Sequence, residues 1–210
     1  MTDEFGPWDP ASVEQVTQVF TGAPFRWWLT GGVALELFIG HSWRAHDDVD
    51  IGICRIDATA AHNWLVGLDP YVAAGGSLRR WVGEPLSAER AENNVWVKRP
   101  AGPFLFDIAI GDGDGSGWMY RRDPGIRRPW DEALLRTPSG VPYLAPEIQL
   151  LFKNKGLRAK DKRDAERVIP AMGNDRRNWL RELLPPDHPW QNLLKAEPRT
   201  GEPSGSQSSE

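Results

Sequence analysis

Two aspartates, Asp48 and Asp50, stand at the start of a short apolar segment that runs to Ile53. Side chains alternate between the two faces of a β-strand, so a strand that begins near Asp48 places both carboxylates on one face. Neighbouring carboxylates repel each other unless a cation lies between them. A hard divalent ion with oxygen ligands, most simply Mg²⁺, meets that need, and the spacing therefore predicts a metal site. The alternative is a solvated strand start whose acidic residues pair with nearby arginines.

A glycine pair, Gly31 and Gly32, stands upstream of the aspartates at the start of an amphipathic segment. Because these positions lack side chains, a ligand can approach the backbone closely. Thr30 is a suitable N-cap for a helix that begins here. The free amides and the positive dipole end of such a helix favour an anion such as phosphate. An anion site next to a metal site predicts that a nucleoside triphosphate is held by its phosphates and a metal ion.

A third aspartate, Asp107, lies in the segment FLFDIAIG at 104–111. If this segment is a strand, its large side chains share one face, namely Phe104, Phe106, Ile108 and Ile110. Asp107 then points to the other, less apolar face, as we expect for Asp48 and Asp50 on their strand. Metal-dependent phosphoryl or nucleotidyl transfer requires such a group of carboxylates. Asp107 alone could also be a satisfied polar residue within a strand.

Apolar periodicity predicts the elements that must position these side chains. Helices are expected at 11–20, 31–39, 58–68, 146–155, 160–169 and 176–184, and strands at 25–29, 48–53, 78–82, 94–99 and 104–110. Gly40 suits the C-terminal cap of the second helix.

Lys155 falls on the inward face of the helix expected at 146–155, whereas Lys153 lies off that face. An inward lysine could contact phosphates, or it could only extend its amine to solvent from a buried stem. In the next helix, Asp161 and Asp164 lie one turn apart beside basic residues. Surface ion pairs account for these two aspartates.

The composition limits the kind of protein. The 210 residues carry a formal net charge of −4 with acidic and basic residues mixed, so there is no strong signal for nucleic-acid binding. The single cysteine, Cys54, excludes an internal disulfide framework and is compatible with a reducing compartment. No segment is long and apolar enough to span a membrane, and the first ten residues do not resemble a secretion signal. We therefore expect a cytoplasmic protein that does not bind membranes.

The segments GGVALELFIG at 31–40 and RAHDDVDIGI at 44–53, with a lone aspartate on a later strand, resemble the small antibiotic nucleotidyltransferases. The similarity is to the aminoglycoside 2''-adenylyltransferase and lincosamide adenylyltransferase group of the DNA polymerase β-like nucleotidyltransferase superfamily. It is close over 27–53 and looser over 104–110. The segment 142–168 resembles the C-terminal helices of the same group with lower specificity.

This resemblance implies an α+β fold, in which a small mixed β-sheet flanked by helices precedes a helical C-terminal part, with the active site between them. Asp48 and Asp50 match the paired metal-binding carboxylates of the family. Asp107 matches the third, which ligates a metal or acts as general base. Gly31 and Gly32 match the phosphate-cradling turn, although many superfamily members have a serine at the second position.

Two basic residues complete the predicted phosphate site. Arg44 is a plausible phosphate contact within the matching segment, and Lys155 is inferred from its helical face more than from the resemblance. We expect three parts in the chain: a nucleotidyltransferase catalytic domain at 1–116, a mainly helical domain at 117–196 and a disordered tail at 197–210. The glycine-rich segment at 111–117 marks the first boundary, and a composition rich in serine, glycine, glutamate and proline marks the tail.

The activity that the resemblance implies is transfer of a nucleoside monophosphate, AMP from ATP, to a hydroxyl of a small molecule. An aminoglycoside or lincosamide antibiotic is a candidate acceptor, and the reaction would be a Mg²⁺-dependent in-line displacement. Two alternatives stay open. The acceptor could be a protein or RNA partner, or the chain could be a non-catalytic nucleotide-binding module, although the presence of all three carboxylates argues against the latter.

Overall fold

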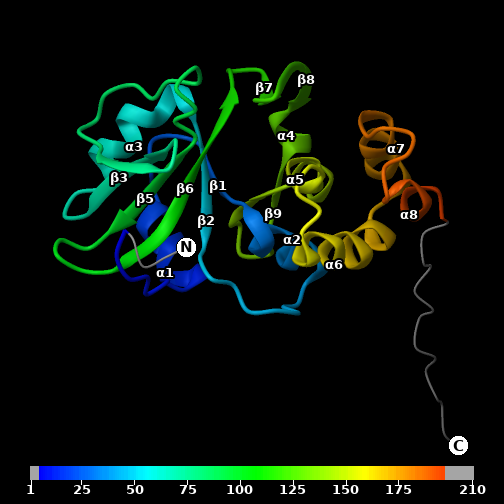
Figure 1. Ribbon diagram of the computed structural model, residues 1–210, viewed down its shortest axis with the longest axis horizontal. Helices are drawn as coiled ribbons and strands as arrows, with labels where there is room; N and C mark the ends of the chain where they lie inside the picture. Colours follow the sequence, from blue (N-terminus) through cyan, green and yellow to red (C-terminus); the bar gives the residue numbers. More distant parts are fainter. Residues whose placement is uncertain (1–4, 197–210) are drawn as a thin grey trace, which may run out of the picture. The chain divides into compact units, whose positions relative to one another are not determined.

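The computed structural model describes residues 5–196, so the tail expected at 197–210 lies outside the described residues (Figure 1). The chain divides into two compact units, the first ending at Ala145 and the second beginning at Pro146. Within the described part, no helix combines the length and the apolar character needed to cross a bilayer.

The first unit is built on a mixed β-sheet (Figure 1). Its described strands are β1 (Trp27–Leu29), β2 (Asp50–Cys54), β3 (Asp69–Ala74), β4 (Ser77–Arg80), β5 (Asn94–Lys98), β6 (Phe104–Gly113), β7 (Gly117–Tyr120), β8 (Asp123–Pro129), β9 (Leu134–Arg136) and β10 (Pro142–Leu144). The main path runs β4-β3-β5-β6-β2-β1-β10-β9, with β7 and β8 branching from β6. The neighbouring strands β2 and β6 are parallel, as are β1 and β10. The expected α+β fold with a mixed sheet is confirmed.

The first unit also contains α1 (Val13–Phe20), α2 (Gly31–Ile39), the 3₁₀ turn η1 (Arg55–Asp57), α3 (Ala58–Trp64) and α4 (Trp130–Ala133). The predicted cap at Gly40 is confirmed, since this residue has the left-handed backbone that ends α2, and its N–H donates to the carbonyl of Glu36 at 2.8 Å. Thr30 occupies the N-cap position of α2, but within the described residues its side chain makes no capping hydrogen bond.

The core of the first unit lies around the central strands β2, β5 and β6. Ile51, Ile53 and Ile108 are fully buried. The prediction that Phe104 shares a face with Phe106 is wrong, because β6 has a bulge at Leu105: Val97 pairs with Phe106, and the next residue of β5, Lys98, pairs with Phe104. Consequently Phe106 packs on α1, whereas the ring of Phe104 packs on the indole of Trp96, which faces the same side of the sheet as Asp107.

The segment 117–144 differs from the helical domain that we expected after residue 116. It forms β7 to β10 and the short α4: β7 pairs with β6 and β8, and β10 pairs with β1 and β9. The pairing of β10 with β1 joins residues far apart in the sequence, which apolar periodicity does not predict. The division between the compact units therefore lies after Ala145 instead of near residue 116.

The second unit is helical in its described part. Its elements are α5 (Pro146–Lys153), α6 (Ala159–Val168), the 3₁₀ turn η2 (Ile169–Ala171), α7 (Asn174–Leu183) and α8 (Gln191–Lys195). Proline begins α5 at a position where no intrahelical N–H is needed. The helices predicted at 146–155, 160–169 and 176–184 correspond to α5, α6 and α7.

The inward orientation predicted for Lys155 is wrong, as is the outward one for Lys153. Because α5 ends at Lys153, the helical period does not extend to Lys155, which is exposed. The Nζ of Lys153 is instead buried between Asp161 and Asp164, at 3.1 and 3.0 Å from their carboxylates. Both aspartates are fully buried, so the interpretation of them as surface ion pairs is also wrong.

Candidate active site

The strands β2 and β6 lie side by side (Figure 1). Asp50 on β2 and Asp107 on β6 are direct partners in this parallel pairing. Residues paired in register point to the same face of a sheet, so their carboxylates lie side by side. The N–H of Asp107 donates to the carbonyl of Val49 at 3.2 Å, as this parallel pairing requires. Because β2 begins at Asp50, Asp48 precedes the strand that we expected it to open.

The environment of Asp107 opposes its ionisation. Burial raises the pKa of its carboxyl well above the usual range, and the negative charge of Asp50 raises it further, as does that of Asp48. Hydrogen bonds from the side chains of Asn94 and Trp96 act in the opposite direction. Both Asp50 and Asp48 therefore act electrostatically on Asp107.

The two oxygens of Asp107 have different surroundings. Oδ2 accepts a hydrogen bond from Nδ2 of Asn94 on β5 at 2.6 Å. Oδ1 is buried and accepts no hydrogen bond from any residue between 5 and 196. A buried acceptor without a donor is costly and marks a place where a cation or a proton can bind.

Gly31 brings the amino end of α2 against Asp50. Its φ of +69° is in the left-handed region, and a Cβ at this position would lie 1.9 Å from Oδ2 of Asp50. Any other residue would therefore strain the backbone and displace the carboxylate. The predicted anion site and the carboxylates are thus in contact through Gly31.

Gly32 accommodates two basic side chains. A Cβ at this position would lie 2.0 Å from Nη2 of Arg44 and 2.6 Å from Cε1 of His46. The glycine pair therefore has an acidic side chain packed against its first member and basic ones against its second. The structure places Arg44 at the amino-terminal turn of α2, where the resemblance implied a phosphate contact.

Glu36 was not among the predicted site residues. It is the one charged residue in GGVALELFIG, only 6 % exposed, and its carboxylate faces the loop that follows α2. Burial alone would raise its pKa, but hydrogen bonds from the Ser42 hydroxyl and the Trp43 N–H, together with the nearby His46, make the net shift downward. A single acid in an otherwise apolar helix is the sequence signal that could have identified it.

Lys155 lies in the second compact unit, so its contact with phosphate stays a prediction. Between residues 5 and 196, no group of three or more His, Cys, Asp or Glu side chains could hold a metal ion as arranged. The structure thus pairs Asp50 with Asp107 and keeps Asp48 within electrostatic reach, without a closed metal site.

Comparisons with known proteins show a family match over part of the chain and similar solved structures. Residues 12–67 match the family model of aminoglycoside-2''-adenylyltransferase. The structure of the lincosamide antibiotic adenylyltransferase LnuA with bound lincomycin is similar at a TM-score of 0.50 and 17% identity, covering 74% of this chain and 95% of that one. ANT(2'')-Ia in complex with adenylyl-2''-tobramycin is similar at a TM-score of 0.52 and 9% identity, covering 81% and 93%. No curated protein matches the chain by sequence. The resemblance to this family is confirmed, and the solved structures show the same fold.

Proposed function

We propose that this chain is a Mg²⁺-dependent nucleotidyltransferase that moves AMP from ATP to a hydroxyl of a small molecule. The observation that carries the proposal is the in-register pair Asp50 and Asp107, packed against the amino end of α2 at Gly31. Asp50 and α2 lie within residues 12–67, which match the family model of aminoglycoside-2''-adenylyltransferase, whereas Asp107 lies beyond the matched residues.

The carboxylates suit a hard cation such as Mg²⁺. Their oxygens are the ligands that Mg²⁺ prefers, Oδ1 of Asp107 is buried without a donor in the described chain, and Asp50 and Asp48 both disfavour ionisation of Asp107. A cation held by these three aspartates would remove the repulsion. When bound, Mg²⁺ would neutralise charge on the nucleotide phosphates and on the departing pyrophosphate.

The remaining groups have separable roles. The amides at the start of α2 and the guanidinium of Arg44 would hold the phosphates, with Lys155 as a further predicted contact. The acceptor hydroxyl would be activated by Asp107 as general base or by the metal ion; as a base Asp107 must be ionised, which a nearby cation would favour because burial and the other two carboxylates raise its pKa. The acceptor oxygen then bonds to the α-phosphorus, the bond from that phosphorus to the bridging oxygen breaks, and pyrophosphate leaves.

The acceptor class follows from the similar structures alone. LnuA was solved with lincomycin and ANT(2'')-Ia with adenylylated tobramycin. We therefore propose an antibiotic of the lincosamide or aminoglycoside type as the acceptor.

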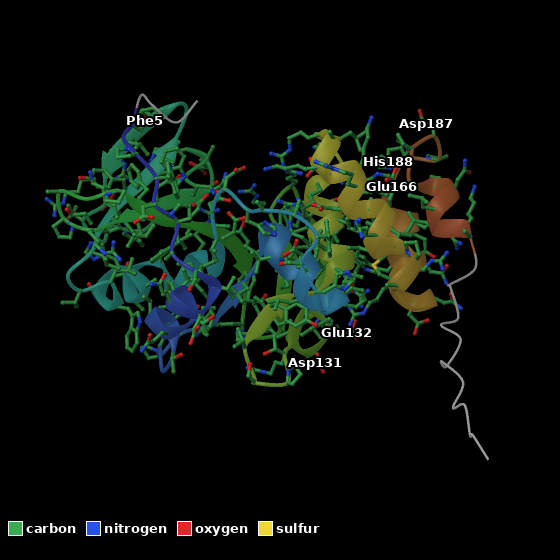
Figure 2. The ribbon with its side chains drawn as sticks, turned by 90° about the horizontal axis from the view of Figure 1, so that it is seen from below. Phe5, Asp131, Glu132, Glu166, Asp187 and His188 are labelled. Atoms are coloured by element: carbon green, nitrogen blue, oxygen red, sulfur yellow. The ribbon has the colours of Figure 1, made fainter. Side chains whose placement is uncertain are left out.

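The test is a pyrophosphate-release screen of each nucleoside triphosphate against lincosamides, aminoglycosides and other polyhydroxylated compounds, with and without Mg²⁺. Mass spectrometry of the acceptor would identify the added nucleoside monophosphate. Asp50→Asn and Asp107→Asn should abolish the release, while Asp131→Asn, an exposed residue of α4, should leave it unchanged (Figure 2). Full Mg²⁺-dependent transfer by the Asp50 and Asp107 variants would contradict the proposal.

A further inference from the structure

Glu36 connects α2 to the loop that carries Arg44. It lies five residues after Gly31 in an otherwise apolar helix, and its side chain is only 6 % exposed. A buried carboxylate costs free energy unless it is hydrogen-bonded or paired with a cation. The partners of this carboxylate therefore indicate what the residue is for.

All of these partners come from the basic loop, which we define as residues 40–46. Oε1 of Glu36 accepts hydrogen bonds from the backbone N–H of Trp43 at 3.0 Å and from that of Arg44 at 3.3 Å. Oε2 accepts one from the hydroxyl of Ser42. Nε2 of His46 lies 3.0 Å from Oε2 but outside hydrogen-bonding geometry, so this contact is electrostatic.

These contacts determine where the two basic side chains lie. The backbone of Arg44 is bonded to Glu36, and its guanidinium lies against Gly32. The imidazole of His46 lies between the same glycine and the Glu36 carboxylate. Without the Glu36 carboxylate, the basic loop would lose the hydrogen bonds from Ser42, Trp43 and Arg44 that tie it to α2.

We infer that Glu36 is a positioning residue that holds Arg44 in place for the nucleotide phosphates. The inference rests on the proposed function. Glu36 itself lies on α2 behind the basic loop and acts through Arg44, so it affects nucleotide binding more than the chemical step. A residue that only stabilised the fold would not change nucleotide binding while leaving the chemical step unaffected.

The first experiment compares Glu36→Gln with Glu14→Gln, an exposed glutamate on α1. Glutamine keeps the size of the side chain but loses the charge that the loop amides and His46 face. For Glu36→Gln we expect the KM for ATP to rise about tenfold, equivalent to one charge-assisted hydrogen bond, while kcat stays within about twofold. Glu14→Gln should change neither constant.

The second experiment is a double-mutant cycle with Arg44→Ala. If Glu36 acts through Arg44, Glu36→Gln should raise the KM for ATP no further once the guanidinium is absent. Additive effects of the two substitutions would overturn the inference. Ser42→Ala, on an exposed loop position, removes one hydrogen bond to Glu36 without changing the helix, and it should raise the same KM by about threefold. It tests the inference even if Glu36→Gln fails to fold.

Amide hydrogen exchange gives a readout that needs no turnover. The N–H groups of Trp43 and Arg44 should exchange faster in Glu36→Gln than in the wild type, and equally fast in Glu14→Gln. If Glu36→Gln changed neither the exchange of these amides nor the KM for ATP, the inference would be overturned while the proposed function would stand. A wild-type protein that neither binds ATP nor releases pyrophosphate would overturn the proposed function, and the inference with it.

Discussion

Gly31 and the Asp50 carboxylate restrict each other. The left-handed backbone of Gly31 lets the chain turn into α2, and the absence of a side chain leaves room for the carboxylate oxygen. The glycine is therefore needed for the fold at the very point where the proposed phosphate and metal sites meet. The positive φ and the space for the Asp50 carboxylate are two separate reasons for glycine at this position, and substitutions can distinguish them.

Gly31→Ala should lose transfer activity as well as stability. Gly22 is a matched control, since its φ is +81° but an added Cβ would meet no atom within 4 Å in the described chain. For Gly22→Ala we expect only the strain of a left-handed alanine, about 1–2 kcal/mol, with activity retained. Gly31→Ala should lower the free energy of unfolding by more, because Asp50 must also move. Urea unfolding and pyrophosphate release measure both effects, and equal losses in the two variants would contradict the argument.

Asn94 should matter for catalysis although it is neither an acid nor a base. Its amide holds Oδ2 of Asp107 at 2.6 Å and thereby determines how Oδ1 is oriented. Asn94→Ala should lower kcat by roughly ten- to a hundredfold through misplacement of the carboxylate, with little change in the KM for ATP. Asn63→Ala, an exposed residue of α3, is the control. Steady-state kinetics at saturating acceptor would test this, and an unchanged kcat would rule out the positioning role.

At the scale of elements, the sequence predicted best what local residues determine. The helix α2 is bounded by Gly31 and Gly40, and strands β2 and β6 have strong apolar patterns. The strands β7 to β10 were missed because β7, β9 and β10 are only three or four residues long and β8 is mostly polar, so none of them shows apolar periodicity. The contacts of Glu36 were missed for a similar reason, since its partners lie in a loop that has no period.

In α5, helical periodicity also failed to identify the buried lysine, which is Lys153 and contacts two aspartates of α6. Lys153→Ala would remove the buried cation that faces both Asp161 and Asp164, although Arg158 would still pair with Asp161, so we expect the free energy of unfolding to fall by about 3 kcal/mol. Lys155→Ala changes an exposed lysine two residues later and should alter it by less than about 0.5 kcal/mol. Chemical denaturation of both variants tests the assignment. If both variants lost a similar free energy of unfolding, Lys155 would be as buried as Lys153, as the helical period predicted.

At the scale of the whole molecule, the proposed active site requires a buried carboxylate at Asp107 that lowers the stability of the fold. The sheet buries Asp107 beside Asp50, in a place where an apolar or neutral side chain would be more favourable. Sequence alone indicated that carboxylates gather here, through the motif at 44–53. It could not give the extent of their burial or the roles of Asn94 and Trp96, because these depend on the register of β5 against β6, which a bulge shifts.

Asp107→Asn should therefore be more stable than the wild type in the absence of metal, although inactive. Because the folded state raises the pKa of Asp107, ionisation of this carboxyl costs stability at neutral pH, and the cost disappears as the pH falls and the carboxyl becomes protonated. In EDTA at pH 7 the variant should gain on the order of 1 kcal/mol of unfolding free energy, and this gain should vanish in acid. Saturating Mg²⁺ and ATP should reverse the order, since ligands that bind only the folded wild type stabilise it by about 2.7 kcal/mol at a hundred times their Kd. Thermal and urea unfolding, with and without Mg²⁺ and ATP, measure both effects; a variant that is less stable in EDTA would show that Asp107 supports the fold instead of opposing it.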